Sequence, residues 1–301
     1  MKDLIEKLKK IGAKRIFIQI ADGLKQEILK IVNILEKNGF ETIVCMENNY
    51  GACDVREYEA RLFKCDTILH IGHSDFGVKT KIKTIYYEFF INKDINFKEL
   101  EKINYKKIGL ISSVNFIPIL KRVKEYLKSI GKKVFLAKTL RYEGQITGCN
   151  ISAASMIEKK VDCFLLITSG KFYALALFQK IKKPIFVFDI DKNRLVNLSK
   201  DFEKYEKIIA WNKVVLKNAT NIGILVSWKK GQMFGNPFKL KKLLEKVGKK
   251  CYILAFDEIS EEKLEGLKLD LLINCACPRI FPDDYEKFKL PIINYYHVFE
   301  N

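Results

Sequence analysis

The sequence predicts an α/β protein built from three similar domains, each a short parallel sheet of about four strands flanked by helices. Short apolar runs rich in β-branched residues alternate with longer segments of helical periodicity, which is the pattern of βαβ units. The pattern restarts near residues 106 and 221, so a unit of about 100 residues is repeated. The first strand of each repeat is apolar with little alternation, as expected of strands covered on both faces.

The elements of each repeat follow from this alternation. The first repeat is expected to have strands at Lys14–Ile20, Glu41–Cys45, Asp66–Ile71 and Lys83–Glu88, and helices at Leu24–Lys37 and Val55–Phe63. The second is expected to have strands at Lys106–Ile111, Lys133–Ala137, Val161–Ile167 and Pro184–Asp189, and helices at Asn115–Ile130, Ile151–Lys159 and Lys171–Lys180. The third is expected to have strands at Asn221–Val226, Lys250–Ala255, Leu269–Asn274 and Pro291–Tyr295, and helices at Pro237–Val247 and Glu261–Leu267.

Two segments between the repeats are predicted to be linkers. Charge rises and strand character is absent over residues 91–105 and 199–219. Trp211 has apolar neighbours, so we expect it to pack onto the body of the protein. The sequence therefore predicts three domains, at residues 1–97, 98–205 and 206–301.

Composition indicates a globular chain. Its 301 residues are 48% hydrophobic, which is enough for one large or several small cores. The first ten residues are charged throughout, and no run approaches the ~20 apolar residues that span a bilayer. We therefore expect a cytoplasmic protein without a membrane segment.

The net charge of +18 is spread along the chain. Only 7 of the 54 basic residues are arginine, and no interleaving of basic and aromatic residues typical of single-strand binding is present. We expect the lysines to form a solvated surface. The alternative is a basic rim that attracts an acidic or ribonucleoprotein-associated partner. Direct binding of nucleic acid is not expected.

Three cysteines lie after predicted strands, where the next segment of the chain begins. Cys53 and Cys149 follow the second strand of their repeats, and Cys277 follows the third strand of its repeat. Ligands of open α/β sheets bind at the carboxyl ends of strands, so the three thiols could meet in a shared metal site, or they could be unrelated thiols. No Cys-x-x-Cys pair occurs, which disfavours a zinc ribbon. Pro278 would suit a first helical position, and Arg279 could compensate negative charge.

The other five cysteines have a simpler interpretation. Cys45, Cys65, Cys163 and Cys251 lie in or beside apolar strands and are predicted to be small buried residues. Cys275 ends a strand two residues from Cys277, so it stays open as a further ligand.

Six short motifs follow one another along the chain. They are Ala21-Asp22-Gly23-Leu24, Tyr50-Gly51-Ala52-Cys53-Asp54, His70-Ile71-Gly72-His73-Ser74, Gly148-Cys149, Ser227-Trp228-Lys229-Lys230-Gly231-Gln232 and Ala276-Cys277-Pro278-Arg279. Their joint order and spacing resemble the archaeal diphthamide synthase family, the 3-amino-3-carboxypropyl transferases of diphthamide biosynthesis. The resemblance covers essentially the whole chain.

The resemblance implies a fold, a cofactor and a reaction. It implies three α/β domains in a pseudo-threefold arrangement, a homodimer, and a 4Fe-4S cluster held by Cys53, Cys149 and Cys277. The cluster would use S-adenosylmethionine and an electron donor in a radical mechanism that transfers the 3-amino-3-carboxypropyl group. The acceptor would be the imidazole C2 of a histidine in translation elongation factor 2. Ser227, Gly231 and Gln232 are the candidate contacts to S-adenosylmethionine, although as loop residues they could equally form a turn.

Two further motifs have interpretations that do not depend on this resemblance. Asp22-Gly23 is predicted to be a turn and helix entry, with a cofactor contact as the alternative, and the His70-x-x-His73 pair is expected to have a polar loop role rather than to bind zinc. No phosphate-binding loop or dinucleotide fingerprint is present.

Two other functions stay open at this point: a quinolinate-synthase-like 4Fe-4S dehydratase, and a non-enzymatic basic protein that binds a translation factor or RNA.

Overall fold

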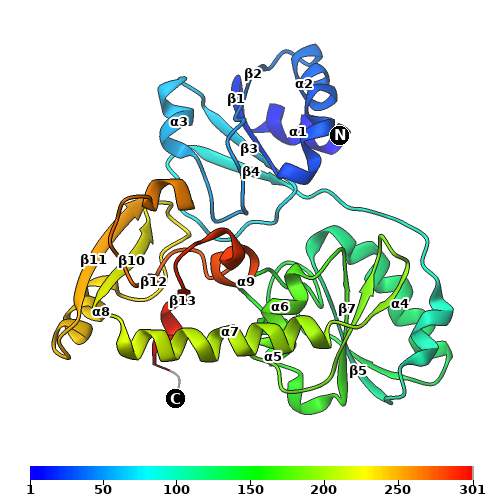
Figure 1. Cartoon of the computed structure of the whole chain (residues 1–301). Coiled ribbons are helices and arrows are strands. Elements are labelled where there is room, and N and C mark those ends of the chain that lie inside the picture. Colours follow the sequence, from blue (N-terminus) through cyan, green and yellow to red (C-terminus); the bar gives the residue numbers. More distant parts are fainter. Residues whose placement is uncertain (300–301) are drawn as a thin grey trace. The chain divides into compact units, whose positions relative to one another are not determined.

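The computed structural model describes residues 1–299, which form three sheets made mainly of parallel strands (Figure 1). The prediction of an α/β fold with three similar sheets is confirmed. The chain divides into two compact units. Unit 1 comprises residues 1–90 together with residues 229–231, and unit 2 comprises residues 91–228 and the chain from residue 232 onward.

Unit 1 contains one sheet with the strand order β2-β1-β3-β4. Its strands are β1 (Arg15–Ile20), β2 (Glu41–Val44), β3 (Thr67–Ile71) and β4 (Lys83–Tyr87), and all neighbours pair in parallel. Its helices are α1 (Lys2–Lys10), the 3₁₀ helix η1 (Asp22–Glu27), α2 (Ile28–Lys37) and α3 (Glu57–Leu62). The charged N-terminal segment is thus helix α1, which buries an apolar stripe of Leu4, Ile5 and Leu8 against the sheet.

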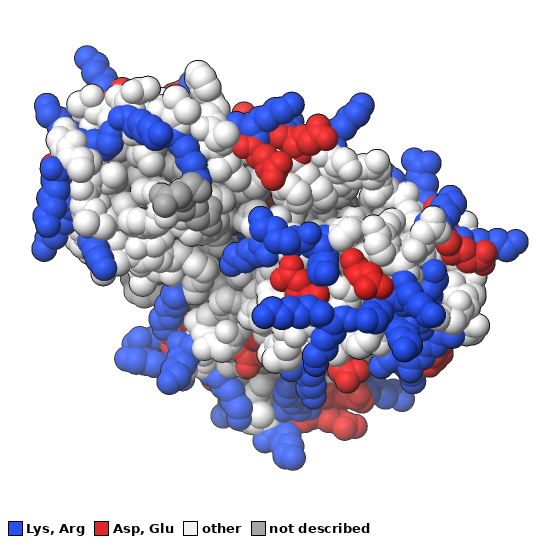
Figure 2. Space-filling model, turned by 90° about the horizontal axis from the view of Figure 1, so that it is seen from below, with Lys and Arg blue, Asp and Glu red and all other residues white. Residues whose placement is uncertain are grey.

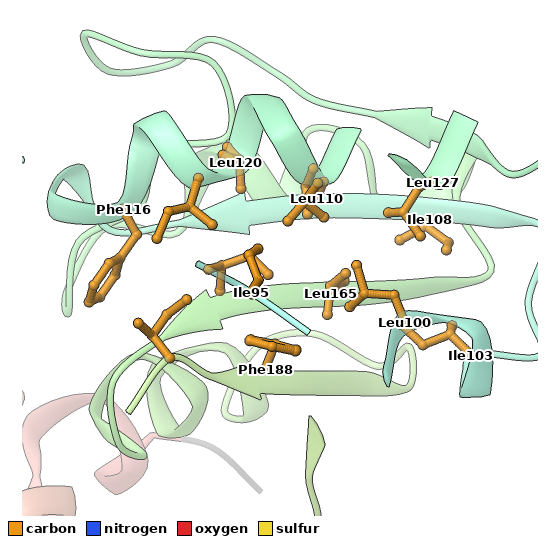
Figure 3. Packing of buried hydrophobic residues seen from close by; sticks show 14 of the residues in the cluster. Ile95, Leu100, Ile103, Ile108, Leu110, Phe116, Leu120, Leu127, Leu165 and Phe188 are labelled. Atoms are coloured by element: carbon orange, nitrogen blue, oxygen red, sulfur yellow. The ribbon is translucent and has the colours of Figure 1, made fainter. Parts of the chain in front are cut away.

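The first sheet of unit 2 has the order β6-β5-β7-β8-β9. Its strands are β5 (Lys107–Ser112), β6 (Lys133–Phe135), β7 (Cys163–Thr168), β8 (Ile185–Asp189) and β9 (Arg194–Val196), of which β9 runs antiparallel. The helices are η2 (Phe97–Lys102), η3 (Val114–Phe116), α4 (Ile117–Ser129), α5 (Ser152–Ser155), η4 (Glu158–Lys160) and α6 (Phe172–Phe178). Leu120 and Leu127 of α4 belong to the same buried cluster as Ile108 and Leu110 of β5, so this helix covers the sheet with an apolar face (Figure 3).

The second sheet of unit 2 has the order β11-β10-β12-β13, and all its neighbours are parallel. Its strands are β10 (Asn221–Ser227), β11 (Lys250–Phe256), β12 (Leu271–Asn274) and β13 (Ile292–Asn294). The helices are α8 (Pro237–Glu245), η5 (Glu261–Leu264), α9 (Ile280–Asp284), η6 (Tyr285–Lys287) and η7 (Tyr295–Val298). Asn236 caps α8 by accepting a hydrogen bond from the Lys239 amide.

The predicted linker at residues 199–219 is helical. Residues Ser199–Asn218 form α7, a helix of 20 residues. Most of its charged residues are exposed, and Tyr205 and Asn212 are buried, so the rise in charge marks the solvent face of a helix. Trp211 is 65% exposed, so its predicted packing is wrong. The predicted linker at 91–105 contains η2, which buries Leu100.

Helix α7 joins the two sheets of unit 2. Phe202 stacks on Phe178 with ring centroids 4.1 Å apart, and the Tyr205 ring lies 5.2 Å from that of Phe281. Further along the helix, the Asn212 amide donates to the Ile292 carbonyl at 2.8 Å. The predicted boundary between residues 205 and 206 falls within this helix, and the division into three domains stays a prediction.

The basic surface is dispersed. Figure 2 shows Lys and Arg side chains scattered over the face that it draws, with acidic side chains between some of them. Within residues 1–299, no helix combines the length and apolar character that crossing a membrane would require.

Candidate functional site

In unit 1, the loop that carries Cys53 is anchored to the carboxyl end of β1. The Gln19 side chain is 1% exposed, and its amide donates to the Asp54 carbonyl at 2.9 Å. The Gln19 side-chain oxygen accepts from the Arg56 amide at 2.9 Å. Two hydrogen bonds from one buried side chain therefore fix the backbone directly after Cys53, which is a half-buried thiol.

Residues 229–231 pack against this same loop within unit 1. The Lys229 ammonium lies 2.9 Å from a carboxylate oxygen of Asp54, and the two side chains are only 5% and 1% exposed. The Lys229 ammonium also lies 5.0 Å from the ring centroid of Tyr50. The Gly231 amide donates to the Cys53 carbonyl at 3.2 Å. A Cβ at position 231 would lie 2.5 Å from that of Cys53, so only glycine allows this approach.

A second buried carboxylate supports the segment. The Lys230 ammonium pairs with Glu57, which also accepts hydrogen bonds from the Lys81 and Ile82 amides. Burial would raise the pKa of Glu57, but the hydrogen bonds from Lys230 and the two amides outweigh it and lower the pKa. Glu57 is therefore a charged anchor for Lys230.

In unit 2, the loop that carries Cys149 follows β6 and is hydrogen-bonded to the end of β5. The Ile146 amide donates to the Ser112 carbonyl at 2.8 Å, and the Ser112 amide donates to the Gly144 carbonyl at 2.9 Å. The Asn150 amide donates to the Thr147 hydroxyl at 3.0 Å, and this hydroxyl lies 3.7 Å from the Cys149 sulfur. The half-buried Cys149 thiol thus sits in a tight turn at the carboxyl edge of the sheet.

The loop that carries Cys277 is held by two buried asparagines. Asn274 ends β12, and its amide donates to the Cys277 carbonyl at 2.8 Å. Asn294 ends β13, and its amide donates to the Pro278 carbonyl at 2.9 Å. Pro278 is not the first helical position as expected, because α9 begins at Ile280 with Arg279 as its cap.

These anchoring residues were missed by the sequence-based prediction. Gln19, Ser112, Asn274 and Asn294 are buried polar residues at or beside the carboxyl ends of otherwise apolar strands. A buried polar side chain is costly unless it is hydrogen-bonded, so each position carried a signal. The side chains of Gln19, Asn274 and Asn294 hold the cysteine loops directly. Ser112 holds its loop through the backbone, and its hydroxyl donates to the Ile167 carbonyl.

The prediction of buried thiols is confirmed for Cys65, Cys163 and Cys251 but not for Cys45. Cys65, Cys163 and Cys251 are buried, and Cys45 is half-buried. Burial raises the pKa of the Cys45, Cys65 and Cys251 thiols, and it raises the pKa of Cys163 to about 12. Cys275 packs in the apolar core beside β12, and burial raises its pKa to about 12. A thiol held neutral in this way is a poor metal ligand.

The candidate cofactor contacts lie in both units. Ser227 ends β10 and is 3% exposed, and Gln232 is 5% exposed. Gly231 belongs to unit 1, where it contacts Cys53. Asp22 opens η1 and pairs with Lys25 at 2.7 Å, so the prediction of a turn and helix entry is confirmed.

Buried His70 and half-buried His73 form a pair at the end of β3. His70 Nε2 and His73 Nδ1 are 3.1 Å apart, and the Asn49 amide lies 3.4 Å from the same His70 nitrogen. Burial lowers the pKa of His70 well below its usual value and lowers the pKa of His73 to about 4. The expected loop role is wrong for His70, because it lies within β3 and is fully buried.

The donor set fits an iron–sulfur cluster. Thiolates are its usual ligands, and each of the three half-buried thiols lies at the carboxyl edge of a parallel sheet. Lys229 and Arg279 lie at the loops of Cys53 and Cys277, where each is paired with an aspartate. Among residues 1–299, neither unit by itself gathers three or more Cys, His, Asp or Glu side chains that could hold a metal ion.

Comparison with known proteins identifies the family. Residues 20–299 match the model of the diphthamide synthesis protein family. The chain belongs to this family. A relative from Pyrococcus horikoshii, 2-(3-amino-3-carboxypropyl)histidine synthase, is 31% identical over 97% of this chain and 86% of its own length. The synthase from Methanocaldococcus jannaschii is 31% identical over 96% of this chain and 84% of its length. The family resemblance and the expectation of an enzyme are confirmed.

Eukaryotic relatives and solved structures agree with this assignment. Subunit 1 of the Saccharomyces cerevisiae synthase is 27% identical over 96% of this chain and 71% of its length. The crystal structure of Dph2 from Pyrococcus horikoshii matches with a TM-score of 0.86 and 30% identity, covering 98% of this chain and 88% of that one. The structure of the same protein with a 4Fe-4S cluster matches with a TM-score of 0.86 and 31% identity over 99% of this chain and 88% of that one.

Proposed function

We propose that the protein is a 2-(3-amino-3-carboxypropyl)histidine synthase that catalyses the first step of diphthamide biosynthesis. It transfers the 3-amino-3-carboxypropyl group of S-adenosylmethionine to the imidazole C2 of one histidine in translation elongation factor 2. The names of the curated relatives at 31% identity support the reaction. The protein works in the cytoplasm as a homodimer and takes electrons from a separate donor.

Cys53, Cys149 and Cys277 are the proposed ligands of one 4Fe-4S cluster. The observation that carries this proposal is the shared construction of their loops, each fixed by hydrogen bonds at the carboxyl edge of a parallel sheet. The similarity to Pyrococcus horikoshii Dph2, whose crystal structure contains a 4Fe-4S cluster, supports the cofactor. Cys275 is not proposed as a ligand, because it packs in the apolar core.

The chemistry needs one open coordination position. A cluster held by three thiolates keeps one iron available to S-adenosylmethionine and, once reduced, would supply the electron that splits the bond between the sulfur and Cγ. The residues of this chain then orient the co-substrate so that this bond is the one broken. Ser227, Gly231 and Gln232 are the proposed contacts to S-adenosylmethionine, and the anchors Gln19 and Asn274 keep two of the ligand loops fixed.

Product analysis tests the proposed reaction. The protein is reconstituted anaerobically with iron and sulfide, reduced with dithionite and incubated with S-adenosylmethionine. We expect methylthioadenosine as the nucleoside product, because the bond to Cγ is cleaved. Release of 5′-deoxyadenosine alone would contradict the proposed bond cleavage.

The same preparation discriminates the two alternative functions. A quinolinate-synthase-like dehydratase would leave S-adenosylmethionine intact. A basic scaffold protein would be colourless and iron-free after reconstitution with its three cysteines intact. Either result would overturn the proposed function.

A further inference from the structure

A small cavity in unit 2 lies between the Cys149 loop and the side chain of Arg279. Its volume is about 90 Å³, and Gly148, Cys149, Gln179, Lys180, Arg279 and Tyr296 contribute to its wall. None of the described residues that line it is acidic, whereas Lys180 and Arg279 are cationic. The cavity therefore has two cationic side chains in its wall, of which Arg279 is paired with Asp283, and it lies beside one of the three proposed cluster ligands.

Arg279 is buried, with only 7% of the residue exposed, and several contacts hold its guanidinium in place. Its Nε donates to Asp283 at 3.0 Å, and its Nη2 donates to the other Asp283 oxygen at 2.7 Å. Nη2 also donates to the Phe172 carbonyl, and the guanidinium carbon lies 4.1 Å from the Phe172 ring centroid. Two residues thus fix the orientation of the whole guanidinium plane.

One nitrogen of this guanidinium has no acceptor. Nη1 is buried, and it makes no hydrogen bond to any residue of the described chain. Gln179 and Tyr296, on the same cavity wall, are already linked to each other at 2.8 Å. The amide of Gln179 donates to Tyr205, and the hydroxyl of Tyr296 accepts from Asn294. Because a buried charged donor without an acceptor is strongly unfavourable, we expect Nη1 to bind an acceptor that the described chain does not supply.

The size of the cavity limits the acceptor. The cavity has room for more than one water molecule, so it can take a small polar group. A carboxylate is such a group, and one of its oxygens can accept from Nη1, whereas a whole nucleoside is far larger.

We propose that Arg279 binds, through Nη1, the carboxylate of the amino-acid part of S-adenosylmethionine in this cavity. The proposal rests on the proposed function, which supplies the co-substrate, and adds a specificity-determining residue to it. Lys180 adds a second positive charge at the wall. Because Cys149 lines the same cavity, the carboxylate would be held beside a proposed cluster ligand.

The local fold keeps this arrangement in place. A Cβ at Gly148 would lie 2.5 Å from the Phe172 ring and 3.3 Å from the Arg279 side chain. Glycine before Cys149 therefore lets Phe172, and with it Arg279, close over the loop. This contact also gives Arg279 a structural role, from which a ligand-binding role must be separated by experiment.

Comparison of two ligands that differ only in the carboxylate makes this separation. Anaerobic calorimetry on the unreduced, reconstituted protein compares S-adenosylmethionine with decarboxylated S-adenosylmethionine. We expect the wild type to prefer S-adenosylmethionine by ~10-fold or more, as a charged hydrogen bond predicts. In Arg279→Gln we expect the affinity for S-adenosylmethionine to fall ~10- to 100-fold, while that for the decarboxylated compound stays within ~2-fold.

Arg122→Gln is the matched control. Arg122 also pairs with an aspartate, Asp94 at 3.2 Å, and lies over a ring, that of Phe97 at 5.7 Å, but its side chain is 36% exposed. We expect this variant to keep the wild-type preference. If Arg279→Gln fails to assemble the cluster, as judged by its visible absorbance, Arg279→Lys replaces it and is expected to lose part of the preference.

Four outcomes would overturn the inference. A wild type without preference would show that the cavity does not take the carboxylate. An equal loss for both ligands in Arg279→Gln would leave Arg279 only its structural role, and an unchanged preference in the variants would exclude it as the binding residue. A wild type that binds neither ligand would overturn the proposed function as well, whereas the other results leave that function intact.

Discussion

The ammonium of Lys229 lies 2.9 Å from the carboxylate of Asp54, the residue that follows Cys53, although 175 residues separate them in the sequence. Both side chains are buried, and Arg56 lies 3.6 Å from the second oxygen of the same carboxylate. The pair therefore belongs to the structure that fixes the Cys53 loop. Its energetic weight differs from that of the many exposed lysine pairs of this chain, because breaking this buried pair leaves Asp54 with only the more distant Arg56 as a cationic partner.

Lys229→Met should destabilise unit 1 by about 3–5 kcal/mol, because it leaves Asp54 buried without its ammonium partner. Urea unfolding measures the loss. Lys204→Met is the matched control, since its pair with Glu286 has side chains 61% and 66% exposed. The control should change stability by no more than about 1 kcal/mol. Equal effects of the two substitutions would refute the assigned role of Lys229.

Gly231→Ala should disturb the Cys53 loop. The new methyl group would lie 2.5–2.7 Å from the Cβ, carbonyl oxygen and Cα of Cys53, so backbone has to shift. We expect a destabilisation of about 1–3 kcal/mol and a lower iron content after reconstitution. Gly23→Ala, where nothing lies within 4 Å of the new methyl group, should leave both quantities close to the wild-type values. An iron content as high in Gly231→Ala as in Gly23→Ala would contradict the contact.

Gly148 and Phe172 should be energetically coupled. Gly148→Ala places a methyl group 2.5 Å from the Phe172 ring and should cost about 1–3 kcal/mol. In the Phe172→Ala background the same change should cost less, because the ring is gone. A double-mutant cycle by urea unfolding should give a coupling of at least about 0.5 kcal/mol. Additive effects would show that the two residues do not press on each other.

The His70–His73 pair predicts a loss of stability in acid. Both histidines are held neutral, because burial lowers their pKa, and Asp22 opposes this only in part for His73. The unfolded chain binds protons near the usual histidine pKa of about 6.5, so it gains protons before the folded chain does. The stability that His73 contributes is present above pH ~6.5 and is lost as the pH falls toward ~4.

The measurement compares the wild type with His73→Asn. Between pH 7 and pH 4.5 the wild type should lose about 1–3 kcal/mol more free energy of unfolding than the variant. Urea titrations at both pH values give this difference directly. Identical pH dependence in the two proteins would mean that His73 is not held neutral.

The fold was predictable where burial and periodicity agree, and the failures have definite causes. Strands such as β5 and β10 are apolar runs that bury nearly every residue, so the sequence locates them within one or two positions. In sequence, helix α7 resembles a linker because it buries few residues and charged residues are frequent along it. Helix α1 escapes prediction for the same reason, since its three buried residues lie among lysines.

The candidate site was predictable only in part. The cysteine loops stand out because they follow strands, whereas the short glycine-containing motif at 227–232 has no structural role that its sequence alone reveals. The pairing of Lys229 with Asp54 depends on residues from distant parts of the chain, and no local pattern encodes it. The unsatisfied nitrogen of Arg279 is likewise visible only in three dimensions.

The proposed ligands make a direct prediction about iron. Cys53→Ala, Cys149→Ala and Cys277→Ala should each abolish turnover and lower the iron content, because each removes one thiolate of the cluster. Cys251→Ala is the control, since this buried thiol lies in the core and its pKa is raised. Iron analysis and visible absorbance after anaerobic reconstitution check the prediction. Full activity in any of the first three variants would contradict the ligand assignment.

Mass spectrometry of the protein substrate tests the central claim most directly. The reconstituted and reduced protein is incubated with S-adenosylmethionine and elongation factor 2, and peptides of the factor are then analysed. The proposed function predicts the added mass of one 3-amino-3-carboxypropyl group on a single histidine, and none with Cys53→Ala. An unmodified factor beside an intact, reduced cluster would contradict it.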